Sequence, residues 1–299
     1  MPNYTCFGIT LHSPVQLPLL TCSSDTVPDV VINLSPPAVQ QQGLPFLSFS
    51  EDSGLTRIIV RPPDVGQFTL GKGAIVSYQP DVSSGFSSFL QLYLTGSILS
   101  LLLYQRGLLV LHGSVVRIRN RTVAFVGHSG AGKSSAAAAC CRQGHALLAD
   151  DIVALSLSDQ EALGQPGFPR LKVHLETAAA LNIPVQSLIS VHPEIDDEFA
   201  FQLSDQFCTD AQPLAAVYLL GEGEREEMKP LSPAAALVEL LQHAMPSRYG
   251  QNGGACQFEQ LSSLVRQVPV FQLLRPGNLE DLHRFPQFVE NHLAGLDRN

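Results

Sequence analysis

The feature that most constrains the fold is a glycine-rich segment, Gly127–Ser134, which reads GHSGAGKS. It matches the pattern G-x-x-x-x-G-K-[ST], follows the β-prone run VAFV and precedes an alanine-rich, helix-prone run. Glycines in such a loop let backbone N–H groups converge on phosphate oxygens, and the N-terminus of the following helix adds partial positive charge. The sequence therefore predicts a strand, loop and helix that bind the phosphates of a nucleotide.

Individual positions of this loop carry expected roles. Lys133 is predicted to contact the β- and γ-phosphates, and the hydroxyl of Ser134 is predicted to ligate Mg²⁺. A glycine-rich turn followed by a chance lysine is the alternative, but the chain contains only four lysines, which disfavours it. The predicted nucleotide contacts are Gly127, Ser129, Gly130, Ala131, Gly132, Lys133, Ser134 and Ser135.

Two adjacent acids, Asp150 and Asp151, follow the apolar run LLA just beyond the predicted helix. This is where a strand of an α/β sheet ends, and ligands bind at that edge. One carboxylate there can hold Mg²⁺ while its neighbour accepts the proton of an incoming hydroxyl. The alternative is a solvated turn, and the apolar residues before the acids favour a functional role.

Basic residues elsewhere in the chain are candidates to complete such a site. His112 follows the apolar run LLVL, where a histidine can tune an aspartate or shuttle a proton, although a structural role is equally open. Transfer of a phosphoryl group also needs positive charge beyond Lys133. Arg170, Lys172 and Arg248 lie in turn-like or helix-end segments downstream, and of these Arg248 is the predicted contributor.

The pattern of elements around the loop predicts an α/β fold. The first eighty residues are rich in Pro, Ser and Gly and contain short β-prone runs at residues 4–10, 30–34, 56–60 and 74–78. We therefore predict a β-rich N-terminal subdomain over residues 1–85 and a P-loop domain over residues 86–299. Within the P-loop domain we expect helices at residues 134–143, 176–181, 258–267 and 279–293, and a strand at residues 214–220. A further helix is expected to begin at Pro233, with Ser232 as its N-cap.

An uncharged apolar segment, Phe89–Tyr104, raises the question of a transmembrane helix. Several polar residues dilute it, so a buried core helix is the prediction. The N-terminus lacks a basic stretch followed by an apolar run, and the six cysteines show neither C-x-x-C nor zinc spacing. We therefore expect a reduced, cytoplasmic protein that makes no membrane contact.

The charge balance bears on the class of partner. The formal net charge is −9, from 27 acidic and 18 basic residues. Such a chain is poorly suited to nonspecific attraction to nucleic acid or anionic lipid. Binding of phosphate is therefore expected to depend on local geometry, and the sequence leaves homo-oligomerisation open.

Three features in this order resemble the catalytic core of the HPr kinase/phosphorylase superfamily: LHG at Leu111–Gly113, GHSGAGKSS at Gly127–Ser135 and LLADDIVAL at Leu147–Leu155. The resemblance implies a P-loop core related to phosphoenolpyruvate carboxykinase. It also implies that Lys133 and Ser134 contact phosphate and Mg²⁺, that Asp150 binds the metal, and that Asp151 is the base for the acceptor hydroxyl, with His112 beside it.

The same resemblance shapes the expected function. The stretch GFPRLKVHLETA stands where a glycine-rich, glutamate-containing signature usually follows the core, which moves the expected acceptor away from HPr. The whole-chain layout is more similar to HPr-kinase-like proteins found beside peptide-modification genes, including those of lasso peptides. The leading hypothesis is an ATP- and Mg²⁺-dependent kinase that phosphorylates a serine hydroxyl of a peptide or protein, such as a ribosomal precursor peptide.

Two other functions stay open at this stage. The acceptor could be a small metabolite, such as a sugar or an amino-acid derivative, rather than a peptide. Alternatively, the chain could be a nucleotide-sensing module that binds ATP without transferring phosphate, although Asp150 and Asp151 argue against it. A GTPase is disfavoured because no N-K-x-D motif occurs in the chain.

Overall fold

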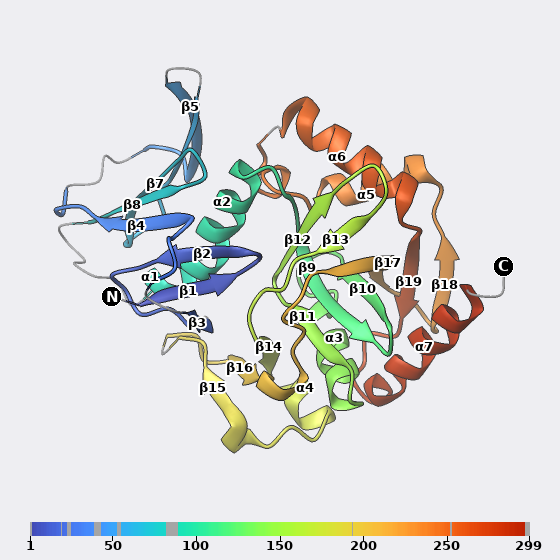
Figure 1. The fold of residues 1–299 in the computed structure, drawn as a ribbon. Coiled ribbons are helices and arrows are strands. Elements are labelled where there is room, and N and C mark those ends of the chain that lie inside the picture. The colour runs from blue at the N-terminus through green and yellow to red at the C-terminus, as the bar shows by residue number, and fades with distance from the viewer. Residues whose placement is uncertain are drawn as a thin grey trace. The chain divides into compact units, whose positions relative to one another are not determined.

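The structure is a computed structural model that describes residues 2–18, 20–22, 25–38, 43–52, 55–81, 89–192, 194–251 and 253–296. The chain divides into two compact units, residues 1–108 and 109–299 (Figure 1). The domain boundary that we predicted after residue 85 falls within residues 82–88, which lie outside the described ranges. The units divide after Leu108 because the end of the apolar helical segment bonds to the N-terminal sheet and its turns. Gln105 Nε2 donates to the Leu70 carbonyl at 3.4 Å, and Arg106 Nη1 donates to the Gly73 carbonyl at 2.8 Å.

The N-terminal unit contains an eight-stranded sheet with the order β3-β1-β2-β4-β8-β7-β6-β5. Its strands are β1 Asn3–Cys6, β2 Ile9–His12, β3 Leu20–Cys22, β4 Val30–Leu34, β5 Leu47–Asp52, β6 Leu55–Val60, β7 Gly66–Gly71 and β8 Ile75–Pro80. Along β7 the residues are alternately buried and half-buried, as expected for a strand with one face on a core. β2, β4 and β8 pair in parallel, whereas β5 to β8 form antiparallel pairs.

One predicted strand is wrong in its extent. The run 4–10 is not continuous, because Phe7 and Gly8 adopt positive φ values of 50° and 72°. They form the turn of a hairpin in which β1 and β2 pair antiparallel, with Cys6 opposite Ile9. A β-prone composition does not reveal a tight turn that uses a phenylalanine in the left-handed region, where non-glycine residues are uncommon.

The apolar segment is helical, as predicted, and comprises α1 Leu90–Tyr93, the π-helical η1 Leu94–Ile98 and α2 Leu99–Gln105. Two of its polar side chains bond back to the helix: Thr95 Oγ1 donates to the Gln91 carbonyl at 2.8 Å, and Ser100 Oγ donates to the Gly96 carbonyl at 2.9 Å. This back-bonding satisfies hydroxyls within an otherwise apolar helix. Within the described ranges, no helix has the length and apolar character needed to cross a membrane.

The C-terminal unit is a mixed α/β structure (Figure 1). Its strands are β9 Leu109–Ile118, β10 Arg121–Val126, β11 Ala146–Ala149, β12 Ile152–Leu157, β13 Ala162–Gly164, β14 Arg170–His174, β15 Leu188–Ser190, β16 Glu198–Gln202, β17 Gln212–Glu222, β18 Glu227–Pro230 and β19 Val270–Arg275. Its helices are α3 Lys133–Arg142, α4 Leu175–Ala180, α5 Pro233–Leu241, α6 Gly254–Gln267 and α7 Phe285–Leu296, with short 3₁₀ turns η2 Val185–Ser187, η3 Ser204–Gln206, η4 Ser247–Tyr249 and η5 Leu282–Arg284.

The main sheet of this unit places several strand ends at one edge. β10, β17 and β19 run parallel to one another, so their C-terminal ends meet there. β9 pairs antiparallel with β10, β11 and β12, which brings the start of β12 beside the middle of β9. A separate sheet, β14-β16-β15, lies next to α3, with β14 in contact with that helix. The loop after β10, the turn before β12 and the strand β14 therefore converge.

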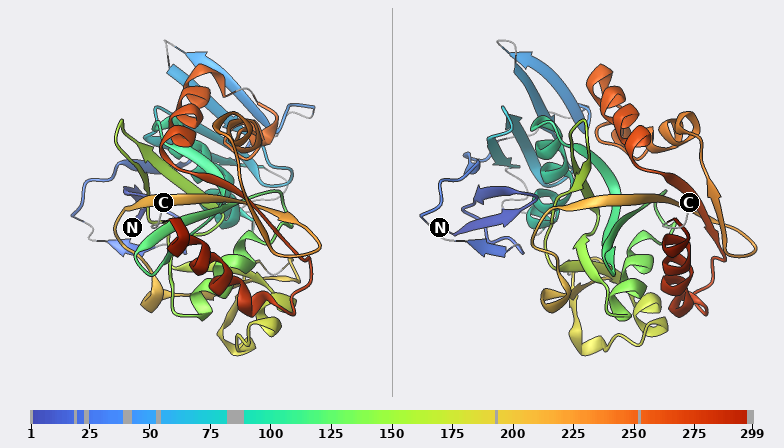
Figure 2. Two further views of the ribbon diagram at one scale, coloured as in Figure 1. Left: turned by 90° about the vertical axis from the view of Figure 1, so that its right-hand side faces the viewer. Right: turned by 45° about the vertical axis from the view of Figure 1, so that its right-hand side comes forward.

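The core lies on both faces of the main sheet. On β10, Val123 and Phe125 pack with α3 and α7, whereas Ala124 and Val126 pack with α5 and α6. This alternation follows from the two-residue period of a strand. The two views in Figure 2 show α3 and α7 covering one face and α5 and α6 covering the other. The α/β class predicted from the sequence is confirmed.

Most of the expected helices occur where the sequence placed them. Ser232 Oγ accepts a hydrogen bond from the Ala235 N–H at 3.3 Å, which confirms the predicted N-cap of α5. The last helix begins at Phe285 rather than near residue 279. The reason is local, because Pro286 has no N–H to donate and is tolerated only in the first turn of a helix.

Candidate functional site

The glycine-rich loop, Gly127–Gly132, connects β10 to α3, and the helix begins at Lys133. Gly130 and Gly132 adopt φ values of 82° and 83°, in the left-handed region that favours glycine. Gly127 leaves no room for a side chain, because a Cβ there would lie 2.9 Å from the Leu220 carbonyl oxygen. The sequence folds locally into a close turn that aims the N-terminus of α3 at the same sheet edge as the strand ends.

Lys133 folds back across this loop. Its Nζ donates to the carbonyl of His128 at 2.7 Å, and the residue is only 6% exposed. The pKa of Lys133 is lowered to about 8, chiefly by burial and then by the positive charge of Arg248, while Asp151 and Asp150 act in the opposite direction. The lysine is therefore a desolvated cation that lies among the predicted site residues.

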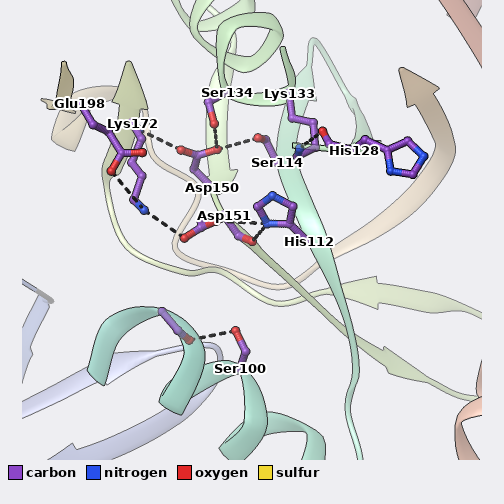
Figure 3. A network of polar contacts seen from close by, with 11 residues as sticks. Ser100, His112, Ser114, His128, Lys133, Ser134, Asp150, Asp151, Lys172 and Glu198 are labelled. Atoms are coloured by element: carbon purple, nitrogen blue, oxygen red, sulfur yellow. Dashed lines mark hydrogen bonds and ion pairs between the residues drawn. The ribbon is translucent and has the colours of Figure 1, made fainter. Parts of the chain in front are cut away.

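Asp150 lies in the turn between β11 and β12 and is nearly enclosed, at 5% exposure. Its Oδ1 accepts hydrogen bonds from Ser114 Oγ at 2.6 Å and Ser134 Oγ at 3.0 Å, and its Oδ2 accepts from the Lys172 backbone N–H at 2.9 Å (Figure 3). Burial nevertheless raises the pKa of Asp150, and the nearby Asp151 raises it further, against the three hydrogen bonds. A buried carboxylate whose ionised form is disfavoured in this way is well placed to bind a cation.

Asp151 follows with a left-handed backbone, φ 69°, so its side chain leaves the turn in a different direction from that of Asp150. Its Oδ1 lies 3.1 Å from His112 Nδ1 and its Oδ2 lies 3.2 Å from Lys172 Nζ (Figure 3). His112 Nδ1 is also 3.0 Å from the Asp151 backbone carbonyl. Non-glycine residues in this conformation are rare and cluster at functional sites.

The electrostatics of Asp151 are opposite to those of Asp150. Burial raises the pKa of Asp151, but the hydrogen bond from His112 and the charge of Lys172 outweigh burial and hold that pKa well below its usual range. Lys172 is held in turn by Glu198, with Nζ 3.7 Å from Oε2. The pKa of Asp150 is therefore raised while that of its neighbour Asp151 is lowered, a pattern typical of two carboxylates with different roles.

Arg248 comes from a distant part of the chain, in the 3₁₀ turn η4. Its segment is bonded to β9: the His112 N–H donates to the His243 carbonyl at 2.9 Å, and the Met245 N–H donates to the Val110 carbonyl at 2.8 Å. The positive charge of Arg248 contributes, after burial, to the lowered pKa of Lys133. Of the three basic candidates downstream of the acids, Lys172 contacts Asp151 directly. The charge of Arg248 acts on Lys133, and the charge of Glu198 acts on Arg170.

Gln257 on α6 braces the segment that carries Arg248. It is 1% exposed, its Nε2 donates to the Met245 carbonyl at 2.8 Å, and its Oε1 accepts from Ser247 Oγ at 2.8 Å. A Cβ at Gly253 would collide with the Gln257 side chain. A buried amide with both ends hydrogen-bonded holds its neighbours in one arrangement, so the backbone next to Arg248 is fixed from both sides.

Sequence reasoning missed several neighbours of the predicted residues. Ser114 contacts Asp150 directly, and the His128 and His243 rings pack edge to face with centroids 4.8 Å apart. Lys172 was a candidate for positive charge near the phosphates, but its ion pair with Asp151 was not predicted. The pKa of His243 is lowered to about 4 by burial and then by His128, Lys133, His112 and Arg248, so this ring is neutral near pH 7. The alternation of β9 could have indicated Ser114, which lies two residues from His112 and on the same face.

The donor set suits one hard cation. Ser134 Oγ and Asp150 Oδ1 lie within 3.0 Å of each other, and Mg²⁺ prefers oxygen ligands, often one or two from the protein together with substrate phosphates and water. Over the described part of the chain, no group of three or more His, Cys, Asp and Glu side chains could hold a metal by itself. The residues present therefore fit a metal that arrives with a phosphorylated ligand.

Known proteins are similar to this chain over the region that holds the site. Residues 108–187 match the family model described as the HPr Serine kinase C-terminal domain. An HPr kinase/phosphorylase of Mycoplasmopsis pulmonis (strain UAB CTIP) is 32% identical over 96 residues, which are 31% of this chain and 31% of that protein. The structure of the HPr(Ser) kinase/phosphatase from Coxiella burnetii aligns with a TM-score of 0.35 and 15% identity, covering 63% of this chain and 98% of that one.

Proposed function

We propose a function from one premise: residues 108–187 of this chain match the family model described as the HPr Serine kinase C-terminal domain. On that premise the chain is an ATP-dependent serine kinase that transfers the γ-phosphate to a hydroxyl of a peptide or protein, such as a ribosomal precursor peptide. Because the match to the HPr kinase/phosphorylase covers about a third of each sequence, the acceptor is proposed from the site and the chain's own layout.

The observation that carries this proposal is the divergence of the two acids beside the loop. Asp150 bonds to Ser134, the first hydroxyl after the loop lysine, whereas Asp151 turns away to His112 and Lys172. A site that only binds phosphate needs the first acid but has no use for a second, ionised carboxylate positioned by a histidine. Phosphoryl transfer to a hydroxyl needs both, one beside the metal and one beside the acceptor.

The roles of the residues follow from this geometry. The loop backbone and Lys133 hold the β- and γ-phosphates, and Arg248 adds positive charge near Lys133 to offset the charge that develops on the transferred group. Ser134 and Asp150 would hold Mg²⁺, which when bound neutralises charge on the phosphate oxygens. Asp151, oriented by His112 and Lys172, accepts the hydrogen bond and then the proton of the serine hydroxyl.

The lowered pKa of Asp151 determines when in the reaction this residue can accept a proton. A carboxylate held ionised is a weak proton acceptor, and general bases are most effective with a pKa near the working pH. In the loose transition state of phosphoryl transfer, however, little proton transfer is needed before the phosphorus–oxygen bond breaks. Asp151 therefore acts first to orient the hydroxyl for in-line attack and takes its proton late.

The test is transfer of phosphate by the full-length protein. Serine-containing peptides, small hydroxyl metabolites and buffer alone are each incubated with MgATP, and product mass and ADP release are measured. We expect a gain of one phosphate on a peptide serine. Transfer to a metabolite alone would favour the metabolite kinase, and tight ATP binding without transfer to any acceptor would favour the nucleotide sensor.

Nucleotide affinity should also depend on pH through Lys133. Because its pKa is lowered to about 8 in the unliganded protein, the ammonium form that binds phosphate dominates below pH 8 and is lost above it. We expect the Kd for MgATP, measured by calorimetry, to rise about tenfold between pH 7 and pH 9. Lys133→Arg keeps its charge over this range and should show a flat profile, and a wild-type profile equally flat would contradict the assignment.

A further inference from the structure

The strand β10, which leads into the glycine-rich loop, pairs with β9 and with β17. The two acids precede β12, a partner of β9, whereas Arg275 ends β19, a partner of β17. β19 runs parallel to β17 and so ends at the same sheet edge as β10. A Cβ added at Gly132 would lie 3.3 Å from Arg275 Cζ, with Nη2 closer still. The guanidinium therefore rests on the glycine that immediately precedes Lys133, where the loop turns into α3.

The position of this arginine is fixed by its backbone more than by its side chain. The Gly223 N–H donates to the Arg275 carbonyl at 2.9 Å, which ties together the ends of β17 and β19. The side chain has one weak hydrogen bond, from Nη1 to the adjacent Pro276 carbonyl at 3.3 Å. Its Nε is buried and has no hydrogen-bond partner among the described residues. Buried donors are nearly always satisfied, so an unpaired one beside a phosphate-binding motif indicates a missing acceptor.

The charges around Arg275 are separate from those around Lys133. Burial lowers the pKa of Arg275, while Glu226 and Glu222 act against burial. The groups that shift the pKa of Lys133 are instead Arg248, Asp151 and Asp150. The loop therefore has cations on two flanks, with Lys133 facing the acids and Arg275 lying on the flank formed by β17 and β19.

We propose that Arg275 binds the α- and β-phosphates of the nucleotide, an inference that rests on the proposed kinase function. The γ-phosphate must face Asp151, where the acceptor hydroxyl is positioned, and the loop lysine reaches the β- and γ-phosphates. The remaining phosphate then extends toward the other flank of the loop. A guanidinium offers a planar pair of donors that matches two phosphate oxygens, and no other type of side chain presents this fork.

The experiment compares two nucleotides that differ only in the γ-phosphate. Binding of MgATP and of MgADP to the full-length protein is measured by calorimetry for the wild type, Arg275→Ala and Arg275→Lys. We expect the alanine variant to raise both Kd values by the same factor, roughly tenfold to a hundredfold, as for loss of a charge-assisted hydrogen bond. The lysine variant keeps the charge but not the fork, so its loss should be intermediate.

Arg284→Ala is the matched control, because Arg284 is exposed and pairs with Asp281 at 3.2 Å. Its two Kd values should stay within about twofold of the wild type. The melting temperature without nucleotide is measured for each variant to show that it is folded. If Arg275→Ala does not fold, the Kd values of Arg275→Lys test the inference instead.

Three outcomes would overturn the inference. Unchanged affinity in a folded Arg275 variant would exclude a phosphate contact, and a loss confined to MgATP would move the contact to the γ-phosphate. In both cases the proposed kinase function would stand. Failure of the wild type to bind either nucleotide would instead contradict that function itself, together with the role of Arg275.

Discussion

Asp151→Asn should lower kcat for phosphate transfer by about 10²- to 10⁴-fold, the usual contribution of a positioned general base. Asparagine keeps the size and the left-handed backbone preference of the residue, but it can neither carry the negative charge nor take the hydroxyl proton. The loop, Lys133 and Ser134 are left in place. The Kd for MgATP, measured by calorimetry, should therefore change by less than about threefold.

The control for this variant has to separate the loss of the base from the loss of the ion pair with Lys172. Glu198→Gln serves that purpose, because Glu198 contacts the same Nζ at 3.7 Å without touching Asp151 or His112 in the described contacts. We expect it to reduce kcat by less than about tenfold. If both variants lowered kcat equally, Asp151 would act only as an anchor for Lys172. If Asp151→Asn abolished ATP binding, Asp151 would belong to the nucleotide site.

The parts of the site that the sequence predicted are those encoded over a short stretch of chain. The loop, the helix that begins at Lys133 and the pair Asp150–Asp151 all lie within one strand–loop–helix–strand unit, whose glycines and apolar runs mark its geometry. The divergence of the two acids was not predicted in its actual form. It arises from the left-handed backbone of Asp151. Aspartate adopts this conformation more often than most residues, but the sequence does not show at which aspartate the tertiary contacts impose it.

The parts that could not be predicted depend on pairing between distant segments. The segment that carries Arg248 lies beside β9 because residues 243–245 bond to that strand, which is more than a hundred positions earlier in the chain. Arg275 reaches the glycine-rich loop as the end of β19, a strand that the sequence analysis did not predict. The signal for β19 was present, because the apolar run VFQLL lies between Pro269 and Pro276. What the sequence does not show is which sheet edge such a run joins.

Asp150→Asn should lower the catalytic activity without lowering the stability of the folded protein. Folding raises the pKa of Asp150, so at neutral pH its ionised form makes the folded state less stable than a neutral group would. An asparagine can satisfy the same neighbours, since its oxygen accepts from the Lys172 N–H and its amide donates to the hydroxyls of Ser114 or Ser134. We expect the Tm of the nucleotide-free variant at pH 7 to equal or exceed that of the wild type.

The same change should cost most of the activity. Without the anionic oxygen beside Ser134, Mg²⁺ would lose the carboxylate that we propose as its ligand, and kcat with MgATP should fall about 10²- to 10³-fold. Ser114→Ala is the matched comparison, because it removes a 2.6 Å hydrogen bond to Asp150 but leaves the carboxylate, and its loss of kcat should be much smaller. Retained Mg²⁺-dependent activity in Asp150→Asn would show that the metal is held elsewhere.

The pH dependence of Tm tests the stability half of this prediction. As the pH falls through the raised pKa of Asp150, the wild-type carboxyl takes up a proton and the penalty for burying its charge disappears. Any stability advantage of Asp150→Asn should therefore be largest near neutral pH and shrink in acid. A variant that melts lower than the wild type at pH 7 would mean that the three hydrogen bonds more than compensate for burial. Asp150 would then stabilise the folded state as well as serve as the proposed metal ligand.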